Sequence, residues 1–183
     1  MRLFLLALLT VLTLSSVRAE APVRAGFTRA EKLSDGYALL LNLCNEDKNA
    51  DGIFLFKTAL PETKETIKRL AALYKQIAKE LEAWDKQDES LDLKNRHLPA
   101  VEAEARKEIS AAHAKEIFAA KTPAFDKLYL TLQWQSLYYG MNLAKSLEKL
   151  ETNPERRRAL AEWLKEFDRL RSEVSRMIPL PTE

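Results

Sequence analysis

Residues 67–84, IKRLAALYKQIAKELEAW, decide the fold of this chain. Their large apolar residues step three, four, three, four and three positions, a spacing that places one apolar stripe along an α-helix. The stripe consists of Ile67, Leu70, Tyr74, Ile77, Leu81 and Trp84. Residues 160–177, LAEWLKEFDRLRSEVSRM, repeat the same steps. A helix with one apolar stripe needs a partner surface, so two such helices predict a helical bundle.

The remaining helices follow from the same spacing rule. We expect long helices from Thr28 to Asn45, from Pro61 through Trp84, from Thr122-Pro123 to Leu147, and from Asn153-Pro154 to Met177. Proline suits the first turn of a helix, because the amide hydrogen that it lacks has no helical partner there. Residues 99–120 carry a thin apolar face among many charges and predict a shorter helix.

These segments predict an all-α fold, namely an up-down four-helix bundle with an additional shorter helix between the second and third long helices. Residues 28–178 form the bundle domain. We expect the bundle axis to be apolar, without an inward cluster of oxygen and nitrogen atoms. The run Ile53-Phe54-Leu55-Phe56 predicts either a short strand or an apolar plug that closes one end of the bundle.

Composition excludes several classes of protein. The chain has 183 residues and one cysteine, Cys44, so an intrachain disulfide and a cysteine-based metal cluster are both excluded. Four glycines are too far apart for a glycine-rich phosphate loop or for the nucleophile turn of a serine hydrolase. At this length a single domain is expected.

The first nineteen residues are typical of a secretory signal peptide. Arg2 gives a positive start, Leu3 to Leu14 is almost entirely apolar, and Val17 and Ala19 form a signal-peptidase site. The apolar run is too short to span a membrane, which takes about 20 residues. We therefore predict a signal peptide at 1–19, an N-terminal extension at 20–27 and a C-terminal tail at 179–183. The protein is expected to be exported, either to the periplasm or as a secreted protein, with outer-membrane association as a further alternative.

Cleavage after Ala19 makes the chain neutral. It removes Arg2 and Arg18 and leaves 27 basic residues against 27 acidic ones. A chain with equal numbers of basic and acidic residues lacks the net positive charge that attracts nucleic acids, so we expect no nucleic-acid partner. No transmembrane span is expected in the processed chain.

The third long helix opens with Phe125-Asp126-x-x-Tyr129-Leu130, which is close to an F-D-x-x-Y-L signature. Over about residues 61–178, the chain resembles a bacterial envelope family of predicted outer-membrane proteins of unknown function. The resemblance implies a ferritin-like four-helix bundle. Where that family usually carries histidines, this chain has Leu73-Tyr74 and Leu137. The resemblance therefore implies the bundle without its histidine ligands.

A calcium-binding loop is an alternative reading of Asp47-Lys48-Asn49-Ala50-Asp51-Gly52, which matches D-x-N-x-D-G. Side-chain oxygens of Asp47, Asn49 and Asp51 can converge on a hard cation, and glycine permits the turn. The twelfth position is Thr58, where such loops carry a bidentate glutamate. Asn, Asp and Gly also form ordinary turns between helices. A weak calcium site and a plain turn both stay open.

Other constellations give weaker signals. The chain has no Glu-x-x-His motif for a di-iron centre, and its reversed pair, His113-x-x-Glu116, lies on a charged helix that favours a solvated surface histidine. Cys44 lies on an apolar helix face and predicts a core residue. Six aromatic residues indicate core packing or, less often, the lining of an apolar pocket: Tyr74, Trp84, Trp134, Tyr138, Tyr139 and Trp163.

We therefore expect an exported, non-enzymatic helical-bundle protein of the bacterial envelope with a binding or structural role and no cofactor. Its partner is expected to be a protein that the sequence does not identify, with a homodimer as one form. Two alternatives are a calcium- or metal-binding ferritin-like protein that uses loop 47–58, and a carrier of a small apolar ligand.

Overall fold

The computed structural model describes residues 27–94 and 98–178, and these residues form helices and no strand. The helices are α1 (Arg29–Asp47), η1 (Ala50–Leu55, a 3₁₀ helix), α2 (Pro61–Gln87), α3 (Ala100–Ala119), α4 (Ala124–Leu150) and α5 (Pro154–Met177). The all-helical prediction is confirmed. The predicted signal peptide (1–19), the tail (179–183) and all but the last residue of the extension (20–27) lie outside the described residues. None of the helices in the two described ranges has both the length and the hydropathy of a membrane span.

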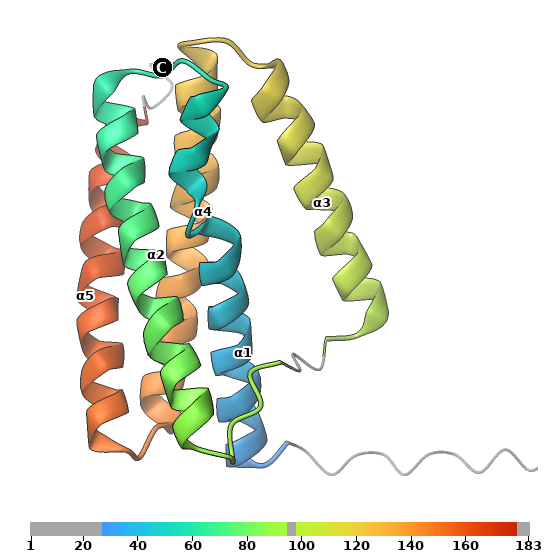
Figure 1. Ribbon diagram of the computed structural model, residues 1–183, viewed down its shortest axis with the longest axis vertical. Helices are drawn as coiled ribbons and strands as arrows, with labels where there is room; N and C mark the ends of the chain where they lie inside the picture. The colour runs from blue at the N-terminus through green and yellow to red at the C-terminus, as the bar shows by residue number, and fades with distance from the viewer. Residues whose placement is uncertain (1–26, 95–97, 179–183) are drawn as a thin grey trace, which may run out of the picture.

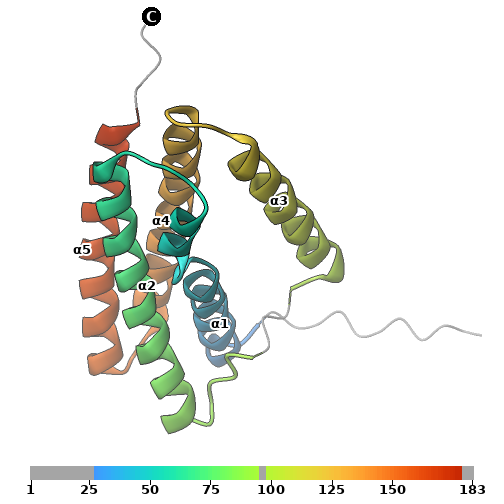
Figure 2. The same cartoon turned by 45° about the horizontal axis from the view of Figure 1, so that its top comes forward.

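Four helices, α1, α2, α4 and α5, pack around a common axis (Figure 1). α1 contacts α2 and α4, and α5 contacts the same two helices, so the four close into a ring. α1 and α5 run in one direction, and α2 and α4 run in the other (Figures 1 and 2). α3 provides the return path between α2 and α4. It lies outside the ring and touches α4 only thinly.

The first column of the ring is built from two pieces. α1 ends at Asp47, partway along the bundle, and η1 continues the column after a break (Figure 1). Ile53 and Phe54 pack against the core, whereas Leu55 and Phe56 are 83% and 75% exposed. The strand alternative for residues 53–56 is therefore wrong, and the apolar plug is correct only for its first two residues.

Helix starts follow local sequence signals. The Thr28 hydroxyl accepts a hydrogen bond from the Glu31 amide at 3.2 Å, and the Glu31 carboxylate accepts one from the Thr28 amide at 2.7 Å. This capping box satisfies amide groups that have no partner in the first turn of α1. Asn153 Oδ1 likewise accepts from two first-turn amides of α5, at 2.9 and 3.2 Å. The predicted starts at Thr28, Pro61 and Asn153-Pro154 are confirmed.

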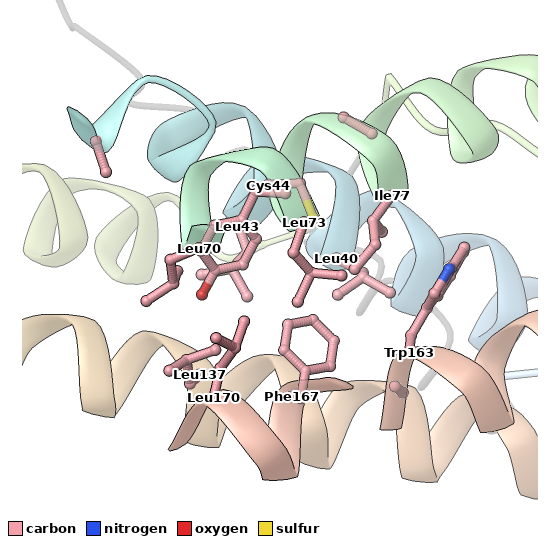
Figure 3. Close-up of a cluster of buried hydrophobic side chains, with 14 of the residues drawn as sticks. Leu40, Leu43, Cys44, Leu70, Leu73, Ile77, Leu137, Trp163, Phe167 and Leu170 are labelled. Carbon is pink, nitrogen blue, oxygen red and sulfur yellow. The ribbon is translucent and has the colours of Figure 1, made fainter. Parts of the chain in front are cut away.

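The centre of the ring is apolar between the α1–α2 pair and the α4–α5 pair. Leu73, Tyr74 and Leu137, where the resembled family carries histidines, are 8%, 0% and 0% exposed. Figure 3 shows side chains of α1 and α2 pointing toward Leu137, Phe167 and Leu170. At the same level, α4 passes close to its neighbours because Gly140 has no side chain. A Cβ atom at Gly140 would lie 3.0 Å from both Leu43 Cδ2 and Phe167 Cζ.

Glu151 closes the end of the bundle at which α4 passes to α5. Its side chain is 3% exposed, and its carboxylate accepts hydrogen bonds from the Tyr37 hydroxyl and from the amides of Thr152 and Asn153, each at 2.7 Å. Arg156 Nε lies 3.4 Å from the same carboxylate. One buried carboxylate therefore joins Tyr37 of α1, the connection to α5 and the first turn of α5.

Aromatic side chains pack together at the same end of the four-helix bundle. The indoles of Trp84 and Trp163 stack with their centroids 5.2 Å apart, and Tyr37 meets Trp84 edge-on at 5.5 Å. These rings come from α2, α5 and α1, so they join three of the four columns.

Candidate functional site

One face of α4 carries a stripe of polar side chains. Asp126, Tyr129, Gln133 and Ser136 step three, four and three positions, which places them along one side of the helix. The first three are only 4%, 6% and 4% exposed. The expectation of an apolar axis without inward oxygen and nitrogen atoms is therefore wrong along this face of α4.

The polar stripe faces the break between α1 and η1. The Tyr129 hydroxyl donates to the Ala50 carbonyl at 2.6 Å. Gln133 Nε2 donates to Asp47 Oδ1 at 3.4 Å, and Ser136 Oγ donates to Asp47 Oδ2. Side chains of α4 therefore bind a carbonyl of η1 and the carboxylate of the last residue of α1.

Tyr74 of α2 extends this network through the core. Its hydroxyl lies 3.0 Å from Ser136 Oγ. A serine hydroxyl has one hydrogen, and that of Ser136 goes to Asp47, so Tyr74 is the donor to Ser136. The chain Tyr74–Ser136–Asp47 thus connects α2, α4 and α1.

Burial governs the protonation of this network. It raises the pKa of the Asp47 carboxyl above its ordinary value, and the hydrogen bonds from Ser136 and Gln133 offset part of that rise. Burial also raises the pKa of the Tyr74 hydroxyl well above its usual value, with a further contribution from the Asp47 charge. Tyr74 therefore stays a donor. Buried carboxyl groups with a raised pKa concentrate at functional sites.

The Phe125–Leu130 motif has a structural explanation at the start of α4. Asp126 Oδ1 accepts from the Leu60 amide at 3.0 Å, directly before the first turn of α2. Phe125 stacks on Tyr129 with their centroids 5.5 Å apart, and Leu130 is buried in the core. The motif therefore ties the starts of α2 and α4 to the break in the first column.

A cleft separates α3 from the ring. An outer hollow of about 890 Å³ includes Leu39, Arg106 and Ile109, and an adjoining inner hollow of about 570 Å³ includes Asp47, Gln133 and Ser136. The two hollows share a set of residues from α1, α3 and α4, namely Leu43, Glu46, Ser110, His113, Ala114 and Tyr139. Asp47, Gln133 and Ser136 of the hydrogen-bond network line the inner hollow, and we call these three residues its polar floor.

α3 forms the other wall of the cleft and packs loosely. None of its residues is buried, and its side chains Val101, Ile109 and Phe118 are 83%, 54% and 58% exposed. Lys57 Nζ holds the last turn of α3, where it donates to the Phe118 carbonyl at 2.9 Å and to the Ala120 carbonyl. α3 is thus anchored at one end and open along the cleft.

The structure places the three predicted calcium ligands near the break, on two different sides. Asp47 is the last residue of α1, and its carboxylate engages Gln133 and Ser136 of α4. Asn49 lines the inner hollow. Asp51 Oδ1 lies 3.9 Å from Lys75 Nζ of α2. The two carboxylates are therefore engaged with different helices in this state, and the calcium site stays a prediction.

The other residues considered as sites, His113, Glu116 and Cys44, do not lie together in one site. His113 lines both hollows of the cleft, whereas Glu116 is exposed and does not. In the described ranges, no group of three or more His, Cys, Asp or Glu side chains is placed to hold a metal ion. Cys44 is fully buried, and burial raises the pKa of its thiol, in agreement with its prediction as a core residue.

The six aromatic residues considered as a pocket lining occupy different places. Trp84 stacks on Trp163, Tyr74 lies beside Phe167 at 6.1 Å, and Trp134 stacks on Tyr138 at 5.5 Å between ring centroids. Of the six, Tyr139 alone lines the cleft hollows. Core packing is therefore the right interpretation for most of the set.

Sequence reasoning missed Tyr129, Gln133 and Ser136 as site residues. The signal that points to them is a polar stripe with helical spacing inside a strongly apolar helix. The residues from Asp47 to Gly52 give a second signal, a break between two helices. The site is found only if this helix break and the polar stripe of α4 are considered together.

The chain matches no protein-family model, no curated protein and no solved structure. No matched protein therefore tests the resemblance carried by Phe125 to Leu130.

Proposed function

We propose that this protein is an exported, non-enzymatic binding protein whose ligand occupies the cleft between α3 and the ring of four helices. The observation that carries this proposal is the polar floor of the inner hollow, where Asp47, Gln133 and Ser136 meet. Its volume of about 570 Å³ suits a small molecule. The floor is supported by packed helices, so it is formed before a ligand arrives.

Binding fits this floor better than catalysis. Ser136 donates its hydroxyl hydrogen to Asp47. A carboxylate is a weak base toward a serine hydroxyl, so this pair does not create a strong nucleophile. The same hydrogen bonds hold the Asp47 carboxylate in one orientation, as recognition of a ligand requires.

A ferritin-like arrangement is part of the proposal. Ferritin-like bundles have one long crossover connection between antiparallel helix pairs. α3 lies in such a connection, between the α1–α2 pair and the α4–α5 pair (Figure 1). The motif Phe125-Asp126-x-x-Tyr129-Leu130 supports the same arrangement and, with it, membership in the bacterial envelope family that the chain resembles.

Export is proposed from the sequence of residues 1–19. Expression of the full chain in a bacterium, followed by intact-mass measurement, tests it. We expect a product that begins at Glu20. A folded product that retains Met1 to Ala19 contradicts the signal-peptide prediction.

Filling the cleft tests the binding function. Ala114 lines both hollows but is exposed on α3, so Ala114→Trp places an indole in the cleft without changing the core. We expect the wild-type protein to bind the neutral dye Nile red, and the A114W variant to bind it at least about tenfold more weakly, which corresponds to about 1.4 kcal/mol. Ala112→Trp is the matched control, because Ala112 is exposed on α3 outside the lining of the cleft. Equal dye affinity in all three proteins contradicts the proposal.

A protein partner or a second copy of the chain is an alternative occupant of the exposed apolar side chains of α3. Val101 and Phe118 belong to that surface. In that case Val101→Ser, outside the lining of both hollows, is expected to impair the interaction and to leave Nile red binding unchanged.

A further inference from the structure

We infer that the ligand of the inner hollow is an organic cation, an amine whose protonated head meets Asp47 and Gln133 and whose apolar body lies along the cleft. This inference rests on the proposed function and adds the chemical class of the ligand. Four features of the inner hollow support it: its charge, an acceptor without a donor, its aromatic rings and its apolar walls.

The charge of the inner hollow is negative. Among the described residues that line it, Glu46 and Asp47 are the acidic ones, His113 is the one histidine, and none is lysine or arginine. The basic residues of the cleft, Arg106 and Lys107, line the outer hollow instead. A partly enclosed site with two carboxylates attracts a cation and repels an anion.

Gln133 carries an acceptor that has no donor within the described part of the chain. Its side chain lines the inner hollow and is 96% buried, and its Oε1 makes no hydrogen bond. The amide cannot simply be reversed, because Nε2 donates to Asp47 Oδ1 at 3.4 Å, and reversal would bring two acceptors together. A buried acceptor without a donor is costly, so an N–H group from a ligand gains more there than at an exposed acceptor.

An alkylammonium group matches these acceptors. It carries three N–H donors and no acceptor. Asp47 and Gln133, whose side chains carry a carboxylate and an amide oxygen, both line the inner hollow. A ligand carboxylate would instead add acceptors to a site that already has an acceptor in excess.

Aromatic rings give a second means of holding a cation. Tyr129 and Tyr139 both line the inner hollow. The Arg106 guanidinium already lies 5.8 Å from the centroid of the Tyr139 ring. A cation of this protein thus uses one face of that ring, which is the interaction that a ligand ammonium makes with tyrosine.

Apolar walls define the rest of the ligand. Leu43, Ile53, Ile117 and Leu132 line the inner hollow. A second charge placed against these side chains would lose its hydration without a partner. These walls therefore suit an amine whose body is an aryl or alkyl group.

Three probes with the same body and different heads test the inference by isothermal titration calorimetry at neutral pH: 2-phenylethylamine, 2-phenylethanol and 3-phenylpropionate. We expect the amine to bind, the alcohol to bind at least about tenfold more weakly, and the carboxylate to bind more weakly still. Asp47→Asn is expected to lower the ratio of amine affinity to alcohol affinity at least about tenfold, and Gln133→Met to lower it in the same direction. Glu82→Gln, at an exposed acid of α2, is the matched control that leaves the ratio unchanged.

The ratio is measured within each variant, so partial loss of folded protein affects both probes alike. If the alcohol or the carboxylate binds as tightly as the amine and A114W blocks it, the amine inference is wrong and the binding function stands. The same holds if Nile red binding is blocked by A114W and the amine does not bind. Amine binding that neither A114W nor D47N weakens overturns the inference as well. Failure of all three probes and of the Nile red experiment removes the proposed function itself.

Discussion

Asp47 holds a charge in a place where burial opposes it. Because folding raises the pKa of this carboxyl, the folded state binds the proton more tightly than the unfolded chain does. The carboxyl therefore favours folding below the ordinary aspartate pKa of about 3.9, and this advantage is lost as the pH rises through the raised pKa. At neutral pH the charge is destabilising, a common property of residues kept for function.

The variant Asp47→Asn tests this balance. We expect it to melt a few degrees above the wild-type protein at neutral pH, because its amide still accepts from Ser136 and carries no charge. The difference is expected to vanish below about pH 4, where the wild-type carboxyl is protonated. Thermal unfolding followed by circular dichroism between acidic and neutral pH measures it. A wild-type protein that is the more stable one at neutral pH would show that the charge stabilises the fold.

Glu151 is buried too, but its carboxylate has hydrogen-bond and ionic partners. Its carboxylate accepts three hydrogen bonds and faces Arg156. Glu151→Ala leaves the three donors without their acceptor and leaves Arg156 with Asp88 as its ionic partner, so we expect a loss of about 2–4 kcal/mol in the free energy of unfolding. Urea denaturation measures it. Glu148→Ala, one turn earlier on α4, is the control and is expected to cost less than about 0.5 kcal/mol; equal losses would remove the special role of Glu151.

At the scale of the helix, Gly140 sets how closely α4 approaches its neighbours. Alanine favours a helix by about 1 kcal/mol over glycine, but its methyl group would lie 3.0 Å from Phe167, a fully buried ring. Overpacking of this kind costs about 1–3 kcal/mol. We expect Gly140→Ala to lower the free energy of unfolding by about 1 kcal/mol, measured by urea denaturation.

Gly52 offers the matched comparison for Gly140. A Cβ atom there would meet no atom within 4 Å. Gly52→Ala is therefore expected to be neutral or to stabilise by up to about 1 kcal/mol, through restriction of the unfolded chain. Equal effects of the two substitutions would show that backbone freedom, rather than space between helices, decides both.

Helix starts could be predicted because their causes are local. Thr28 and Asn153 cap the turns that follow them, and both signals lie within four residues of the chain. The position of α3 has no such local cause. Its apolar face is thin, and Val101 and Ile109 stay exposed, so no strong burial holds this helix against the ring.

At the scale of the whole molecule, the stability of the folded protein tests the calcium-binding alternative. A ligand that binds only the folded form raises the melting temperature. Because Asp47 and Asp51 engage different helices, we expect millimolar calcium to leave the melting temperature unchanged relative to a chelator control. A rise with calcium that Asp51→Asn abolishes would contradict this expectation and establish the alternative.

The whole bundle could be predicted from apolar spacing, but the site could not. The stripes on residues 67–84 and 160–177 specify which faces are buried, and these faces do form the core. The site depends on Asp47 meeting Gln133 and Ser136 across 86 and 89 positions of the chain. The motif around Asp47 predicts a cation loop, because the residues that face it in the structure lie far away in the sequence.

The stacked indoles of Trp84 and Trp163 have an optical consequence. Two coupled chromophores 5.2 Å apart, one on α2 and one on α5, produce an exciton signal that depends on their mutual angle. Near-ultraviolet circular dichroism of such rings follows tertiary packing rather than helix content. The third indole, Trp134, stacks on Tyr138 and lies in another part of the four-helix bundle. The protein therefore carries an intrinsic spectroscopic label for the closure of one end of its bundle, separate from the face on which a ligand would sit.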